Sequence, residues 1–289
     1  LYMIAAGKSA LSMVCSITGG ILNIVLDYVF ISILDMGIAG AAIATGLGYS
    51  VTAVAGLVIF SKKDCLLHFV KPVCRIRTLV SAASNGSSEM AAALVTGIVT
   101  MMFNWTMLKY VGENGVAAIT IIMYVLMFAT SLYTGYSYGV APMISFYYGE
   151  QNQDKLKKLI RLSMKIIGFI GAAALMVSLA VTEPLVAIFA RPDNPVYDLA
   201  VTGNRICSST LVFIGFNVFA SGMFTALSNG LVSAVLAFSR SFVFMVAAML
   251  ILPAILGVTG AWLATPAAEA AAFLLSAVMF IKYRKKYQY

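Results

Sequence analysis

Residues 19–31, GGILNIVLDYVFI, place an aspartate inside an otherwise apolar run. Asp27 follows Asn23 by four residues, so both side chains share one face of a helix. Counting outward from the turn at Asp35, Asp27 and Thr45 lie roughly 12 and 15 Å below it, at similar depth. A carboxylate, an amide oxygen and a hydroxyl are oxygen ligands suited to an alkali cation, and the carboxylate could instead hold a proton. We therefore predict cation binding and coupling at Asp27, Asn23 and Thr45.

A purely structural role is the alternative for these residues. An ionised carboxylate in mid-helix costs about 2.5 to 3.5 kcal/mol on insertion scales, which packing alone rarely offsets. Thr45 by itself would be unremarkable, because threonines satisfy their own helix backbone. Its partnership with Asp27 makes it a candidate.

Two further acids, Glu89 and Glu269, lie about 10 and 11 residues into apolar runs, roughly 15 Å deep. Each is a possible second-lobe acid that couples to a proton or binds a cationic drug. For Glu89 the alternative is a polar contact to the surrounding SNGSS at 84–88. Glu269 stands among alanines that permit tight packing, and the structural role is the favoured interpretation there.

The chain contains 16 methionines and many aromatic residues, which could line a soft cavity for flat lipophilic cations. Phe103, Tyr124 and Met127 are the candidate cavity residues. Met and Phe are also ordinary core or lipid-facing residues, and that interpretation is the stronger one. Pro142 and Pro266 are candidate hinges, because each removes a backbone donor and can bend its helix.

The elements that must position these residues are membrane helices. Hydrophobic residues make up 61% of the chain and the mean hydropathy is +0.95, well above the ordinary soluble range. A membrane helix needs about 20 mainly apolar residues, and uniformly apolar runs of this length favour helices over barrel strands. The predicted fold class is all-α integral membrane protein, with eight spans at 11–34, 36–61, 79–108, 116–147, 163–182, 199–227, 231–255 and 258–281.

The net charge of +8 comes from basic residues grouped between and after the spans. The three groups lie within 62–77, 155–165 and 282–286, and the span count puts all of them on one side of the membrane. By the positive-inside rule this side is the cytoplasm. We expect a multi-pass protein of the cell inner (plasma) membrane with a cytoplasmic C-terminus.

The residues available argue against several kinds of site. His68 is the only histidine, which leaves almost nothing from which to build a metal site or a serine–histidine triad, and the four cysteines form no CxxC pair. No GK[ST] phosphate loop is present, which argues against an ATP-driven pump. We expect that the protein is not an enzyme and that it binds no cofactor, and no metal beyond a possible Na⁺ at Asp27.

Residues 36–45, MGIAGAAIAT, repeat at 256–265, LGVTGAWLAT, with five identities in ten. Such a repeat suggests two equivalent lobes, an architecture common in secondary transporters. The second copy has Val243 and Ala247 where the first has Asn23 and Asp27, so the oxygen site is not duplicated.

Three segments in the right order resemble the MATE family, the multidrug and toxic compound extrusion transporters. They are GGILNIVLDYVFISILDMGIAGAAIAT at 19–45, GYSYGVAPMISFYYGE at 135–150 and GVTGAWLATPAAE at 257–269. The resemblance implies a two-lobe helical bundle of the MATE/oligosaccharide-flippase type, with about eight of twelve helices present and the first four missing. It also implicates Asn23, Asp27 and Thr45 in cation binding. Many members have proline after the aspartate, where this chain has Tyr28, so a bend there is in doubt.

The resemblance implies four regions. Residues 1–61 end the N-terminal lobe (family helices five and six), 62–78 form the cytoplasmic inter-lobe loop, 79–282 form the C-terminal lobe (helices seven to twelve), and 283–289 form a cytoplasmic tail.

The predicted function is a cation-coupled antiporter, using Na⁺ or H⁺, that exports organic, cationic or lipophilic drugs by alternating access. We expect a monomer whose partners are a small-molecule substrate and membrane lipid, with no nucleic acid. A lipid-linked oligosaccharide flippase stays open, although Lys109, Arg205 and Arg240 all sit near span ends rather than in a cavity row. A membrane-embedded enzyme or a channel is the alternative from another class.

Overall fold

The computed structural model describes residue 3 and residues 8–62, 68–70 and 76–287. Within these ranges the side chains of 9, 77–78, 80–93 and 285 lie outside the description. The described residues are almost entirely helical and contain no strand, which confirms the all-α prediction. They divide into two compact units, Leu1–Val80 and Ser81–Tyr289, called here the N-terminal unit and the C-terminal unit.

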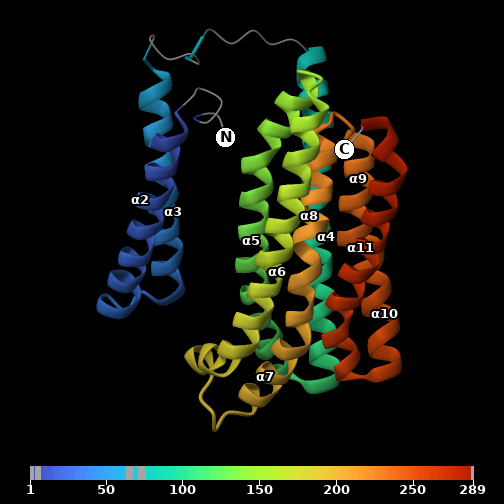
Figure 1. Cartoon of the computed structure of the whole chain (residues 1–289). Coiled ribbons are helices and arrows are strands. Elements are labelled where there is room, and N and C mark those ends of the chain that lie inside the picture. The colour runs from blue at the N-terminus through green and yellow to red at the C-terminus, as the bar shows by residue number, and fades with distance from the viewer. Residues whose placement is uncertain (1–2, 4–7, 63–67, 71–75, 288–289) are drawn as a thin grey trace. The chain divides into compact units, whose positions relative to one another are not determined.

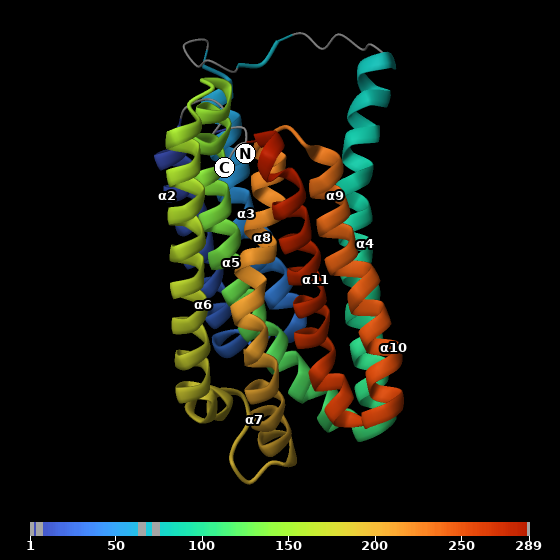
Figure 2. The same cartoon turned by 45° about the vertical axis from the view of Figure 1, so that its right-hand side comes forward.

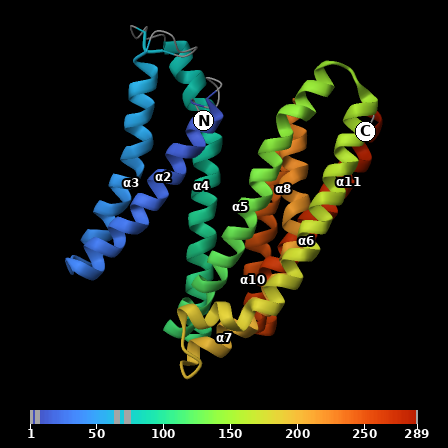
Figure 3. The same cartoon turned by 60° about the vertical axis from the view of Figure 1, so that its left-hand side comes forward.

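The N-terminal unit is a helical hairpin. Helix α2 (Ser9–Asp27) continues as a π-helical segment, η1 (Tyr28–Ile33), and α3 (Gly37–Phe60) returns beside it. The two helices lie side by side in Figure 3. A Cβ at Gly19 would lie 2.6 Å from the carbonyl oxygen of Gly48, so the two backbones touch where neither helix has a side chain.

The C-terminal unit is a bundle of long helices, visible in Figure 1 and, turned, in Figure 2. Its elements are α4 (Ile76–Val111, all but its first residues), α5 (Glu113–Gly149), α6 (Gln153–Phe189), α7 (Pro195–Cys207), η2 (Ser208–Thr210), α8 (Leu211–Ala226), α9 (Gly230–Phe238), η3 (Ser239–Phe244), α10 (Met245–Leu256) and α11 (Val258–Tyr287). The elements α7, η2 and α8 follow one another without a break and form one continuous helical segment. The elements α9, η3 and α10 form another, in which η3 is π-helical like η1.

Seven of the eight predicted spans match described helices that are long and apolar enough to cross a membrane. The remaining one, 79–108, falls within α4, a helix of 36 residues. The chain is therefore a multi-span helical membrane protein.

Moving an apolar side chain from lipid into the protein interior gains little free energy, because lipid tails are equally apolar. Close packing and buried hydrogen bonds therefore hold the C-terminal unit together. Phe219, Phe224 and Trp262 are fully buried in its core. Between α6 and α7, Asn204 donates to Thr182 Oγ1 at 3.0 Å, and the Ser178 and Ser208 hydroxyls lie 2.8 Å apart. These bonds satisfy polar groups that would be costly in the bilayer.

The sequence repeat has a structural counterpart. Gly37 and Gly257 stand where α3 and α11 begin, with positive φ angles of 54° and 57°, a region that glycine enters without strain. Three residues later, Gly40 packs against Phe30, and Gly260 packs against the Leu252 carbonyl. Both helices thus turn back tightly on the span before them.

Candidate functional site

Two of the three predicted cation ligands meet in the N-terminal unit. Asn23 Nδ2 of α2 donates a long hydrogen bond to Thr45 Oγ1 of α3, 3.5 Å. The Thr45 hydroxyl donates its own proton to the Ala41 carbonyl, 2.9 Å. Its oxygen therefore keeps lone pairs available on the side that faces Asn23.

Asn23 and Thr45 line a small hollow between α2 and α3 with a volume of about 230 Å³. Glycines and small polar residues make up the rest of its wall: Ser16, Gly19, Gly20, Gly48, Tyr49 and Thr52. The glycines leave the space open, because they have no side chain to fill it.

Asp27 lies one helical turn beyond Asn23, at the end of α2, and does not line this hollow. Its Oδ1 atom is buried and has no hydrogen-bond partner among the residues that the structure describes. Buried polar atoms are normally satisfied, so an orphaned carboxylate oxygen in a membrane span is exceptional. A bound cation or a proton is the kind of partner this oxygen lacks.

The helix changes form directly after Asp27. Residues Tyr28–Ile33 are π-helical, and the Leu34 N–H reaches five residues back to the Val29 carbonyl at 2.9 Å. A π segment widens the helix and frequently marks a functional site. The distortion occurs although Tyr28 stands where many family members have proline.

The three predicted cavity residues come together in the C-terminal unit. Phe103, Tyr124 and Met127 line one cavity of about 490 Å³ bounded by α4, α5, η3 and α11. Arg240 and Glu269 are its only charged lining residues among those the structure describes.

Glu269 is 5% exposed and fully partnered. Its Oε1 accepts from Arg240 Nε at 2.8 Å, and its Oε2 accepts from Asn217 Nδ2 at 2.7 Å. Ser276 in turn donates to Asn217 Oδ1 at 3.1 Å. The carboxylate of Glu269 thus links three spans, through an ion pair with Arg240 and a hydrogen bond from Asn217, which is compatible with the structural role favoured for it.

Arg240 is the residue that sequence reasoning missed. It was expected near a span end, and that expectation is wrong: it lies in η3, in the middle of the span Gly230–Leu256. Its position ten residues inside an apolar run was the available signal. Lys109 does lie in the last turn of α4, and Arg205 pairs with Glu183 at 2.7 Å on an exposed surface.

The remaining predicted residues are placed as follows. Glu89 lies in α4, but its side chain is outside the described residues. Pro142 and Pro266 lie inside helices that continue past them. Pro266 cannot donate to the Trp262 carbonyl one turn back, and the Cys207 thiol donates to that carbonyl instead, 3.3 Å.

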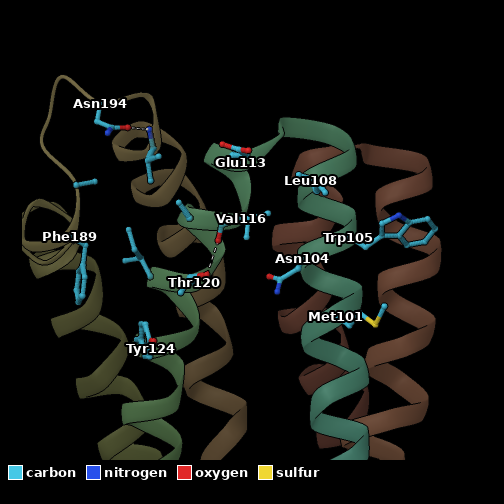
Figure 4. Close-up of a pocket in the computed structure, with 14 residues that line it drawn as sticks. Met101, Asn104, Trp105, Leu108, Glu113, Val116, Thr120, Tyr124, Phe189 and Asn194 are labelled. Atoms are coloured by element: carbon cyan, nitrogen blue, oxygen red, sulfur yellow. Dashed lines mark hydrogen bonds between the residues drawn. The ribbon is translucent and has the colours of Figure 1, made fainter. Parts of the chain in front are cut away.

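A larger groove, about 890 Å³, opens next to the cavity at the α4–α5 turn. Figure 4 shows Asn104 projecting from α4 toward α5, which carries Thr120 and Tyr124, with Glu113 at the turn. Asn104, Thr120 and Tyr124 line both the groove and the cavity. The two hollows therefore share part of their walls.

The described residues offer no cluster of ligands for a multivalent metal ion. Within the described ranges no three His, Cys, Asp or Glu side chains gather as a multivalent metal site would require. The orphaned oxygen of Asp27 and the apolar, aromatic cavity instead suit a small cation and an organic solute.

Comparison with known proteins agrees with this description. The MatE family model matches residues 89–251, more than half of the chain. The Multidrug export protein MepA of Staphylococcus haemolyticus (strain JCSC1435) is 25% identical over 282 residues, covering 96% of this chain and 61% of that protein. MepA of Staphylococcus saprophyticus subsp. saprophyticus is 23% identical over 258 residues, covering 88% of this chain and 56% of that protein. The chain thus spans about three fifths of these relatives' length.

Solved structures share the fold. A multidrug resistance MATE family transporter of the MOP superfamily, in an inward-facing conformation, superposes with a TM-score of 0.85 at 23% identity, covering 99% of this chain and 67% of that one. The outward-facing conformation of such a transporter gives 0.82 at 22% identity, covering 98% and 64%. On the match to the family model, supported by this fold, the chain belongs to the MatE family of membrane transporters.

Proposed function

We propose that this chain belongs to a cation-coupled antiporter that exports organic, cationic or lipophilic compounds by alternating access. The observation that carries the proposal is the buried Oδ1 of Asp27, which lies inside an apolar span and has no hydrogen-bond partner within the described part of the chain. Relatives named as multidrug export proteins support the substrate class. The proposed setting is the plasma membrane with the C-terminus in the cytoplasm, acting as a monomer.

Asp27, Asn23 and Thr45 are the proposed coupling site. A proton needs only the carboxylate, whereas Na⁺ needs several oxygen ligands, and the Asn23 side-chain carbonyl and the Thr45 hydroxyl are the further oxygens proposed for it. Their side chains are already in contact, since Asn23 Nδ2 lies 3.5 Å from Thr45 Oγ1. Coupling arises if the ion and the solute bind the inward and outward conformers with different affinity, since only differential affinity shifts such an equilibrium.

The cavity of the C-terminal unit is the proposed solute site. Phe103 and Tyr124 offer aromatic surface to a flat cation, and Met127 adapts to its shape. A lipid-linked oligosaccharide flippase would be favoured by a row of basic residues facing the cavity. Among the described residues that line the cavity, Arg240 is the basic one, and it is paired with Glu269, which favours the antiporter.

The test is transport by the complete open reading frame that encodes these residues, purified and reconstituted in proteoliposomes. Ethidium, a flat organic cation, is loaded, and an imposed Na⁺ or pH gradient is expected to drive its movement. Asp27→Asn is expected to abolish the gradient-driven component and leave membrane insertion intact. Asp35→Asn, at the exposed turn eight residues later, is the matched control and is expected to transport normally.

Normal gradient-driven transport in Asp27→Asn contradicts the coupling site. Ethidium flux that ignores both gradients contradicts the antiporter and favours a channel.

A further inference from the structure

The basic residues of two helix ends form a groove that the proposed transport function does not use. Lys157, Arg161 and Lys165 follow one another at four-residue spacing on α6, so they form one stripe. Arg284 of α11 joins them, and together these residues line a groove of about 340 Å³. Figure 3 shows the beginning of α6 and the end of α11 at the same end of the bundle.

The charge in this groove is uncompensated. No acidic residue lines it, and none of the four basic residues pairs with a carboxylate in the part of the chain that the structure describes. Arg161, Lys165 and Arg284 are exposed, and Lys157 is half-buried. Neighbouring lysines behave differently: Lys155 stacks on Tyr147 and Lys282 on Tyr283, outside the groove.

Beneath the charges the groove is apolar. Ile160, Met164, Phe280 and Ile281 complete its wall, and Ile281 is 75% exposed. Both helices then continue into apolar membrane spans. A groove with basic side chains at one part of its wall and apolar side chains at the other suits a phospholipid, whose phosphate headgroup is anionic and whose acyl chains are apolar.

We propose that the α6–α11 groove binds an anionic phospholipid, with the phosphodiester held by Arg161, Lys165, Arg284 and Lys157, and an acyl chain lying along Met164 and Ile281. Arginine forks suit the phosphate oxygens bidentately, and the lysines add point charges. This inference goes beyond the proposed transport function and does not depend on it.

The test is native mass spectrometry of the complete protein in detergent, titrated with phosphatidylglycerol, phosphatidylcholine or inorganic phosphate. The variant Arg161→Gln/Arg284→Gln removes two groove charges. The control Lys155→Gln/Lys282→Gln removes two charges from the same helix ends without touching the groove wall. Size-exclusion profiles check that both variants remain folded.

The parent protein is expected to retain phosphatidylglycerol in preference to phosphatidylcholine. Each cation that contacts the bound headgroup contributes roughly a fivefold factor to the affinity. The groove variant loses two such contacts and is expected to lose at least about tenfold in affinity, whereas the control loses none and is expected to lose less than about twofold. Equal losses in both variants, or none, overturn the site. Equal binding of phosphatidylcholine overturns the anionic preference, and displacement of the lipid by millimolar phosphate assigns the groove to a small anion instead.

Discussion

Arg240 Nε lies 2.8 Å from Oε1 of Glu269, and this pair joins two neighbouring membrane spans of the C-terminal unit. Their side chains are 22% and 6% exposed, so water solvates neither charge fully. Asn217 occupies the second carboxylate oxygen. Both carboxylate oxygens of Glu269 therefore accept a hydrogen bond from a donor on another helix.

Removing one partner of this pair is expected to cost far more than removing both. Arg240→Gln leaves a buried carboxylate uncompensated, which typically costs about 3 to 5 kcal/mol, whereas Arg240→Gln/Glu269→Gln leaves no charge behind. Thermal unfolding in detergent checks this: the single variant is expected to melt well below the parent, and the double variant close to it. A double variant that melts as low as the single one would show that the charge pair itself is essential.

The pair Arg205–Glu183 provides the contrasting case. It has a similar distance, 2.7 Å, but its side chains are 54% and 60% exposed. Exposed ion pairs contribute about 0 to 1 kcal/mol, so Arg205→Gln is expected to leave the melting temperature almost unchanged. A large loss would contradict the view that burial makes the Arg240 pair costly to break.

The contact between Gly19 and Gly48 predicts a position that tolerates no methyl group. A Cβ at Gly19 would lie 2.6 Å from the Gly48 carbonyl oxygen, so Gly19→Ala is expected to separate α2 from α3 and cost about 1 to 3 kcal/mol. Gly20→Ala meets open space and is the control, expected to be neutral or slightly stabilising. Thermal melting of the two alanine variants compares them directly, and equal behaviour would refute the close contact.

Thr45 offers a way to distinguish the coupling ions. Thr45→Val keeps the shape but removes the hydroxyl oxygen that accepts from Asn23. If Na⁺ is the ion, the concentration for half-maximal transport is expected to rise about tenfold, the scale on which one supporting contact affects metal affinity. If H⁺ is the ion, Thr45→Val is expected to show the same pH dependence of transport as the parent protein. Thr45→Ser, which keeps the hydroxyl, serves as the control in both cases.

The features that depend only on helix geometry can be predicted from the sequence. The pairing of Asn23 with Thr45 follows from residue spacing and a tight turn, and the structure places the two in contact. Residue type alone makes Phe103, Tyr124 and Met127 candidates for a cavity wall, and tertiary packing brings them together at one cavity. The Arg240–Glu269 pair depends on the rotation of two spans about their axes, which no local pattern encodes.

The π-helical segments also had no signal in the sequence, because one altered backbone hydrogen-bonding register changes neither composition nor hydropathy. The cavity volumes likewise follow from how whole helices pack.

Both π-helical segments stand beside a charged residue: Asp27 directly precedes η1, and Arg240 lies within η3. Each residue of an α-helix advances the chain by about 100° around the axis. Removing one residue from 28–33 and restoring an α-helical turn would thus swing Asp27 by more than a quarter of a circle relative to the turn at Asp35. In both spans, the direction in which the charge points is set by the length of the chain as much as by the residues it contains.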